Sequence, residues 1–244
     1  MNTTYFRTTD ALVCLPAQPE TGSSTSVPSD GRSSPSPVWI DLTALDHAAR
    51  TMLQEQHGLS PEVMTYFLLR YQSAKLIHAG PALFLVTFLA APSTRYLFTT
   101  RELKICVTPT LVVTLCGASG KAQSDLRRTL PLPNFSEGKI GQLLWGLLAG
   151  VVGSYDALVK TVKEQSCEAM SGEEQQQCRR RVTKLLHCLR DEQALLSNVA
   201  RKGGKVFTPE ESLRFRQLEE RVGVLARVVW DISREGEGLE GGGA

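Results

Sequence analysis

The sequence lacks any apolar run long enough to be expected to cross a membrane. Its two longest runs, Pro81–Pro92 and Leu143–Gly153, fall short of the roughly 20 residues that a transmembrane helix needs, so both are predicted to be buried core elements. The N-terminus also lacks a basic region followed by an apolar stretch, so no secretion leader is predicted. We therefore expect a cytoplasmic protein with no direct membrane span and with its six cysteines reduced.

An excess of charge of one sign is missing as well. The 244 residues carry 27 basic and 25 acidic side chains, a formal net charge of +2. Proteins that bind nucleic acid usually carry a clustered basic excess, so no nucleic-acid partner is expected. The hydrophobic fraction of 42% is enough to form a core.

Arrangements typical of catalysis or of bound cofactors are also missing. The sequence has no Gly-x-Ser-x-Gly, His-Glu-x-x-His or Rossmann glycine pattern. Its four histidines, at positions 47, 57, 78 and 187, are scattered along the chain. Whether any of them pairs with Asp41, Asp46 or Asp156 is not visible from the spacing. The segment Gly117-Ala-Ser-Gly-Lys121 follows a predicted strand, but its glycine spacing is wrong for a phosphate loop, which leaves a plain turn. We expect neither an enzyme nor a resident cofactor.

Two cysteines flank a predicted break between helices. Cys167 and Cys178 lie on either side of Ser171-Gly172. A disulfide across this break is compatible with the spacing, whereas a reducing compartment favours free thiols. The short Cys-x-x-Cys spacing typical of zinc sites is absent, so we expect buried or idle thiols.

What the sequence does contain is an α/β body followed by a helical arm. Residues 1–37 are predicted to hold a short strand in the apolar segment Ala11–Leu15 and then a Ser/Pro-rich flexible linker. Residues 38–135 form the body, with strands predicted at 38–42, 75–78, 83–89, 102–108 and 111–116. Helices are predicted from about Asp46 to a stop at Gly58, over 61–70 after the Ser60-Pro61 start signal, and over 121–129.

The arm over residues 136–235 is predicted to be three long helices. Apolar side chains recur at helical spacing over 137–168, 174–200 and 209–235, and the glycine-rich tail 236–244 cannot continue the last helix. Thr208 and Glu211 form a start signal for that helix. The first two helices are expected to pack as an antiparallel hairpin. The fold class is therefore a mixed sheet with flanking helices, then a long helical hairpin and a final long helix.

Several stretches resemble the CorA family of magnesium and divalent-cation transporters. Val38-Trp-Ile-Asp-Leu-Thr43 is similar to the W-I-D/N-L/I-T opening strand of the family, and His57-Gly-Leu-Ser-Pro61 is similar to its G-x-H-P turn. Ala82-Leu-Phe-Leu-Val86 and Thr110-Leu-Val-Val-Thr114 resemble the Y-x-F-x-V and N-F-L-V-T strands. Leu143-Leu-Trp-Gly-Leu-Leu-Ala-Gly-Val-Val-Gly-Ser-Tyr155 resembles L-L-Y-A-L-L-D-A-I-V-D-x-Y and is the most specific match. The resemblance covers about residues 38–235.

The resemblance implies a cytoplasmic domain of the CorA type without the conducting part, because the Gly-Met-Asn pore signature is absent. Family members bind regulatory Mg²⁺ between subunits through acids on the helix equivalent to 61–70. Here those positions read Met64-Thr65-Tyr66-Phe67. The opposing acid falls at Glu219 or Glu220, and we take Glu220 as the metal candidate whose partner acid is replaced by Tyr66. Because a hard cation needs several oxygen ligands, Mg²⁺ is expected to bind weakly if at all.

The implied role is a regulatory or scaffold module at the cytoplasmic face of the membrane. The family's pentamers imply a homo-oligomer, and a transmembrane transporter subunit is the implied partner. The alternative is a stand-alone helical protein-interaction module derived from the same fold, in which the arm binds another protein. A pore-bearing continuation of the reading frame after Ala244 would favour the first hypothesis, and a stop codon the second.

Overall fold

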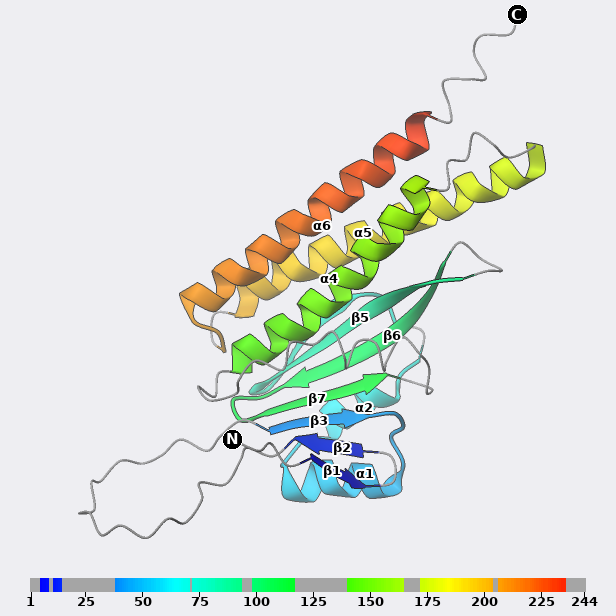
Figure 1. Ribbon diagram of the computed structural model, residues 1–244. Helices are drawn as coiled ribbons and strands as arrows, with labels where there is room; N and C mark the ends of the chain where they lie inside the picture. Colours follow the sequence, from blue (N-terminus) through cyan, green and yellow to red (C-terminus); the bar gives the residue numbers. More distant parts are fainter. Residues whose placement is uncertain are drawn as a thin grey trace, which may run out of the picture.

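The computed structural model describes residues 5–8, 11–14, 38–70, 72–93, 98–116, 140–164, 172–203 and 206–235 (Figure 1). The strands are β1 (Tyr5–Thr8), β2 (Ala11–Cys14), β3 (Val38–Leu42), β4 (Lys75–Ala79), β5 (Ala82–Pro92), β6 (Phe98–Val107) and β7 (Leu111–Cys116). The helices are α1 (His47–Thr51), the π-helical η1 (Met52–Gln56), α2 (Pro61–Leu68), α4 (Ile140–Glu164), α5 (Gly172–Lys202) and α6 (Pro209–Glu235). The linker expected at 18–37, the helix expected at 121–129 and the Gly117–Lys121 turn lie outside the described residues.

The strands form one seven-stranded mixed sheet in the order β1-β2-β3-β7-β6-β5-β4. Strands β3 and β7 pair in parallel, and every other neighbouring pair is antiparallel. Gly80, with φ of 60°, forms the turn between β4 and β5, a conformation that glycine adopts without steric cost. Strand β2 confirms the strand expected near Ala11, whereas β1 was not predicted.

Each face of the sheet is covered by a different set of helices, because side chains alternate along each strand. Ile40, Phe84 and Val86 lie on the face that packs against η1 and α2 through Leu53 and Phe67. The neighbouring positions on the strands point to the opposite face, where α4, α5 and α6 lie together (Figure 1). The sheet therefore separates α2 from the arm.

Helix α4 is the arm element that lies directly on the sheet. Among the described helices, it alone is long and apolar enough to cross a membrane by length and composition, with 25 residues and a hydropathy of 1.3. The expectation that no segment reaches this length was wrong, because the helix continues past Gly153 to Val162 with only two charged residues, Asp156 and Lys160, in that stretch. The window is 56% buried, and Leu144, Leu147 and Val151 are fully enclosed by strands and helices. Its place in the structure is that of a core helix.

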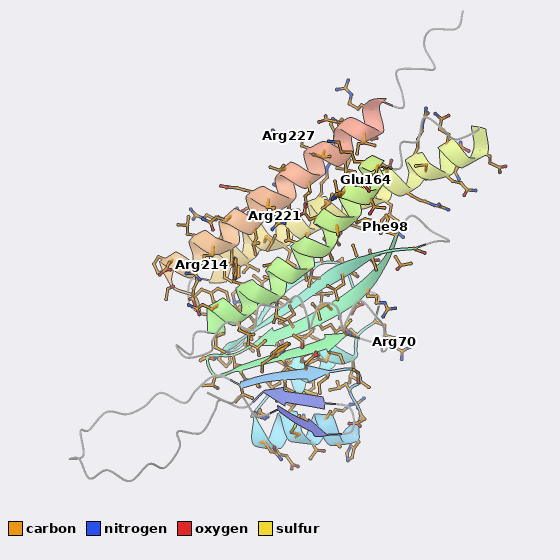
Figure 2. All side chains as sticks on the ribbon, viewed as in Figure 1. Arg70, Phe98, Glu164, Arg214, Arg221 and Arg227 are labelled. Atoms are coloured by element: carbon orange, nitrogen blue, oxygen red, sulfur yellow. The ribbon has the colours of Figure 1, made fainter. Side chains whose placement is uncertain are left out.

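Helix α6 completes the arm by packing along both α4 and α5, and α5 runs antiparallel to the other two helices (Figure 1). Its start confirms the predicted capping box. The backbone N–H of Glu211 donates to Thr208 Oγ1 at 3.2 Å, and the N–H of Thr208 donates to Glu211 Oε2 at 2.8 Å. Further along, the exposed Arg221 of α6 forms an ion pair with Asp156 of α4 (Figure 2). The mixed sheet with flanking helices, followed by three long helices, confirms the predicted fold class. The expected close pairing of the first two arm helices was wrong, because α5 packs mainly along α6 and α6 packs along α4.

Candidate functional site

The first half of the candidate site is the outer face of α2. The helix starts where predicted, because the Ser60 hydroxyl accepts from the N–H of Val63 at 3.3 Å and Pro61 occupies the first helical position. Met64 and Phe67 are buried in the core beneath the helix. Only Thr65 and Tyr66 of the four family positions therefore reach the outer side of α2.

Tyr66 is joined on this face by a carboxylate that the sequence analysis overlooked. The Tyr66 hydroxyl donates to Glu62 Oε1 at 3.2 Å, one helical turn away. This hydrogen bond raises the pKa of Tyr66, so the phenol stays neutral over the physiological range. The Tyr66 ring is fixed from below by Phe84, with 5.5 Å between ring centroids. The outer face of α2 thus offers one carboxylate and one neutral phenol.

Two buried polar side chains, one from β6 and one from the loop that follows α2, hold the end of α2 in place. Lys104, only 7% exposed, donates from Nζ to the carbonyl oxygens of Phe67, at 2.8 Å, and Leu69. Gln72 Nε2 donates to the carbonyl oxygens of Tyr66 and Leu69 at 3.0 and 3.1 Å. Lys104 Nζ is also 3.0 Å from Glu102 Oε1. These bonds satisfy the carbonyl groups that a helix leaves free at its C-terminus.

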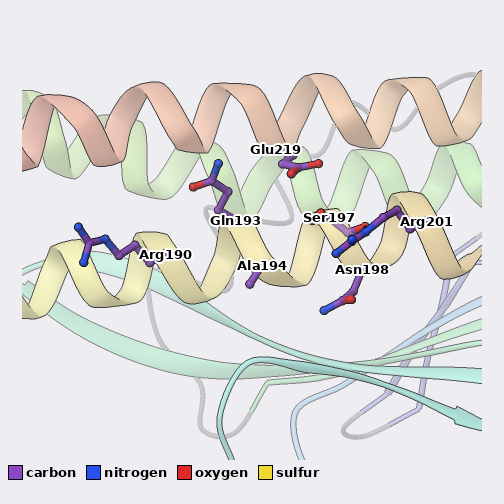
Figure 3. A pocket seen from close by; sticks show the side chains of 7 residues that line it. All are labelled: Arg190, Gln193, Ala194, Ser197, Asn198, Arg201 and Glu219. Atoms are coloured by element: carbon purple, nitrogen blue, oxygen red, sulfur yellow. The ribbon is translucent and has the colours of Figure 1, made fainter.

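The second half of the candidate site is the outer face of α6. Glu220 is exposed there, one helical turn from the exposed Val224 and two from the exposed Leu213. Glu219 points instead toward α5 and lines a groove with a volume of about 290 Å³ (Figure 3). The other lining residues all come from α5: Arg190, Gln193, Ala194, Ser197, Asn198 and Arg201. Of the two acids that the sequence left open, Glu220 is therefore the more exposed one.

The two halves do not meet within one chain. Tyr66 packs against the core beneath α2, whereas α6 belongs to the core on the opposite face of the sheet. Within the described part of a single chain, no three His, Cys, Asp or Glu side chains converge as ligands for a metal ion. A cation held between Tyr66 and Glu220 would need a second copy of the chain.

The aspartates that were considered as partners of histidines have structural contacts. Asp46 Oδ1 accepts from the N–H of Ala49 at 2.8 Å and caps α1. Asp41 Oδ1 accepts from the Thr114 hydroxyl at 2.6 Å, and that hydroxyl accepts from Trp39 Nε1 at 3.0 Å. These contacts connect the parallel strands β3 and β7 in the core.

The cysteines depart from the expectation in one respect. Cys178, near the start of α5, is disulfide-bonded, so the expectation of free thiols was wrong for this residue. The redox argument considered only the compartment and not the local proximity of sulfur atoms. Cys106 and Cys116 are buried, and burial raises the pKa of Cys106 to about 12. Neither is suited to be a reactive thiolate.

Two buried charged residues were also missed, although each leaves a signal in the sequence. Glu192 occupies a position of the apolar stripe of α5, between Leu189 and Leu196 at helical spacing. Lys104 interrupts the apolar run Leu103–Val107 in the second half of β6. A charged residue at a core position of a periodic pattern predicts a buried polar contact.

Solved structures match the chain, whereas no family model and no curated protein sequence does. The soluble domain of CorA from Methanocaldococcus jannaschii matches with a TM-score of 0.68 and 18% identity, over 82% of this chain and 86% of that one. The complete CorA magnesium transporter from the same organism matches with a TM-score of 0.70 and 18% identity, over 96% of this chain and 76% of that one. The ZntB cytoplasmic domain from Vibrio parahaemolyticus RIMD 2210633 matches with a TM-score of 0.59 and 12% identity, over 84% of this chain and 88% of that one. The chain has the CorA soluble-domain fold.

Proposed function

We propose that this chain is a CorA-like cytoplasmic module of a magnesium or other divalent-cation transporter, acting as a regulator or scaffold without conducting ions itself. The observation that carries the proposal is the match to the isolated soluble domain of CorA over 82% of this chain and 86% of that one. Fold alone does not determine function, so the exposed surfaces of α2 and α6 supply the second line of support.

Those surfaces favour a homo-oligomer, for which the family's pentamer is the proposed form. Leu213 and Val224 on α6 are 55% and 59% exposed, and Leu68 and Leu69 at the end of α2 are 45% and 46% exposed. Because α2 and α6 lie on opposite sides of the sheet, α2 of one copy is free to face α6 of the next. Such head-to-tail contacts form a closed ring when the rotation from one copy to the next closes, which is the arrangement that we propose.

A regulatory cation would bind between copies in this arrangement. Glu62 and Tyr66 of one copy would face Glu220 of the next. Mg²⁺ is bound in proteins through one or two carboxylates plus water, and a neutral phenol is a poor substitute for a carboxylate. Mg²⁺ is therefore expected to bind this chain weakly, with Glu220 as the coordinating residue on α6.

Cross-linking between copies tests the assembly. Thr65 of α2 and Gln217 of α6 are both exposed, and neither is a proposed ligand. A mixture of the variants Thr65→Cys and Gln217→Cys should form an inter-chain cross-link with a short bismaleimide, identified by mass spectrometry. Lys184→Cys, an exposed position on α5, serves as the control partner for Thr65→Cys and should not cross-link. Absence of the Thr65–Gln217 cross-link, or equal cross-linking at Lys184, would contradict the proposed assembly.

One observation favours the alternative of a helical interaction module. Trp230 on α6 is 43% exposed, and the guanidinium of Arg190 lies 5.6 Å from its ring centroid, beside the groove between α5 and α6. Exposed Trp and Arg side chains are enriched where proteins bind one another. Under this alternative, a cross-linker placed at Arg190 in cells would capture a different protein, and the Thr65–Gln217 pair would stay unlinked.

A further inference from the structure

A buried carboxylate joins the helical arm to the sheet. Glu192 of α5 is 1% exposed, and its Oε2 accepts a hydrogen bond of 2.6 Å from the hydroxyl of Thr87, a fully buried residue of β5. The other oxygen, Oε1, has no hydrogen-bond partner among the described residues. Glu192 therefore has one specific contact to the sheet and an unsatisfied acceptor in the interior.

The surroundings of Glu192 contain little to balance a negative charge. Helix α4 contributes the buried hydroxyl of Tyr155, and α5 itself contributes Cys188 and Asp191. Thr87 pairs with Leu103 of β6, so Arg101, two residues further along β6, lies on the same face of the sheet, as does His78 of the edge strand β4. The buried side chains of α6 are apolar except Glu211, which lies against Gly141 at the start of α4.

The energetic consequence is a preference for the neutral acid. The pKa of Glu192 is raised from its ordinary value of 4.5 to about 7, mainly by burial and in smaller part by Asp191, while the Thr87 hydrogen bond opposes the rise. When Glu192 ionises, its negative charge is buried away from water and is stabilised by only one hydrogen bond, so the ionised form is unfavourable. Neutral Glu192 keeps the same contact, because the acid can donate to Thr87 Oγ1.

We infer that Glu192 and Thr87 form a proton-sensitive latch that holds α5 on β5 when Glu192 is protonated and loosens this contact when Glu192 ionises. The latch concerns the packing of the arm on the sheet and does not depend on the proposed transporter role. It would let the arm respond to a change in proton concentration near neutral pH.

The direction of the effect follows from linkage. The pKa of Glu192 is higher in the closed state than in an opened or unfolded state, where it returns to about 4.5. Below that value both states hold the proton and the latch is fully closed. As pH rises from about 4.5 to about 7, opening becomes about tenfold more favourable per pH unit, and it levels off above about 7.

Hydrogen exchange measured by mass spectrometry on the full chain tests the latch. Exchange of the peptides covering 83–92 and 185–199 is compared between the wild type and Glu192→Gln at each pH, so that the intrinsic pH dependence of exchange cancels. The ratio of wild-type to variant rates should rise by about tenfold per pH unit between about pH 5 and 7 and then stay constant. Asp191→Asn removes the same charge at an exposed neighbouring position. It should keep the tenfold rise per pH unit and reach the plateau at a slightly lower pH, because Asp191 helps to raise the pKa of Glu192.

A ratio that does not change with pH would overturn the inference, as would loss of the profile in Asp191→Asn. Thr87→Val supplies an independent test if Glu192→Gln does not fold. Because the Thr87 hydrogen bond lowers the pKa of Glu192, its removal should raise that pKa. The exchange rate should then level off at a higher pH in Thr87→Val than in the wild type. A plateau that stays in place in Thr87→Val would show that the two residues do not act together.

Discussion

Replacing Lys104 with Met should release α2, the helix that carries Glu62 and Tyr66. The ammonium group is buried and bonds the carbonyl oxygens of Phe67 and Leu69 as well as the Glu102 carboxylate. Met has a similar length and apolar character, so the change removes the charge and donors with little change in volume. Breaking a buried ion pair by removing one partner typically costs about 3–5 kcal/mol, since Glu102 loses its cationic partner and the Phe67 carbonyl loses its donor.

Urea unfolding followed by circular dichroism measures this cost, and trypsin measures the local effect. Arg70 follows α2 directly and is exposed (Figure 2), so a released helix should be cut faster after Arg70. Lys184→Met makes the same chemical change at an exposed position of α5 and should alter the unfolding free energy by less than about 0.5 kcal/mol. If Lys104→Met is as mild as Lys184→Met, or if cleavage after Arg70 is unchanged, Lys104 does not hold α2 and the reasoning fails.

Three further predictions concern the core of the arm and the cation site. Leu147→Ala should cost about 2–5 kcal/mol in a thermal or urea melt, because Leu147 is fully buried, and no change would mean that the site collapses without loss. Gly141→Ala should destabilise the protein, because its Cβ would lie 2.3 Å from the capping carboxylate of Glu211, whereas Gly146→Ala meets nothing and should stabilise by about 0.5–1 kcal/mol; the same sign for both would refute this packing. A Mg²⁺ site with millimolar affinity would add about 1.4 kcal/mol to the unfolding free energy at about 10 mM Mg²⁺. In thermal melts with Ca²⁺ and a sodium control at matched ionic strength, we expect a smaller stabilisation by Mg²⁺ for the wild type and a larger one for Tyr66→Asp. Strong stabilisation of the wild type by Mg²⁺ would contradict the weak site.

The parts of the fold that sequence reasoning predicted are those determined by local chemistry. Ser60 and Pro61 start α2, Thr208 and Glu211 start α6, and the apolar stripe places α4 in the core. Such signals depend on neighbours within one or two helical turns, so they are visible in the sequence. They predicted the order of elements and the fold class.

The parts that could not be predicted depend on contacts distant in sequence. Lys104 reaches carbonyl groups about 35 residues away, and Glu192 reaches Thr87 across 105 positions. The register of the sheet and the layer order of the helices bring these groups together, and neither is encoded in a local pattern. Glu62 was not predicted for a different reason, since it lies one helical turn before Tyr66 and outside the four positions that the family resemblance marks.

Divalent-cation uptake by cells tests the central claim most directly. In the organism that encodes this chain, deleting its gene should change the initial rate of Mg²⁺ or another divalent-cation uptake, and restoring the chain should reverse that change. The same chain expressed alone in a strain deficient in magnesium transport should not rescue growth at low Mg²⁺. Unchanged uptake of all tested divalent cations after deletion would contradict the transporter-module account, and rescue by the chain alone would contradict the claim that it does not conduct ions.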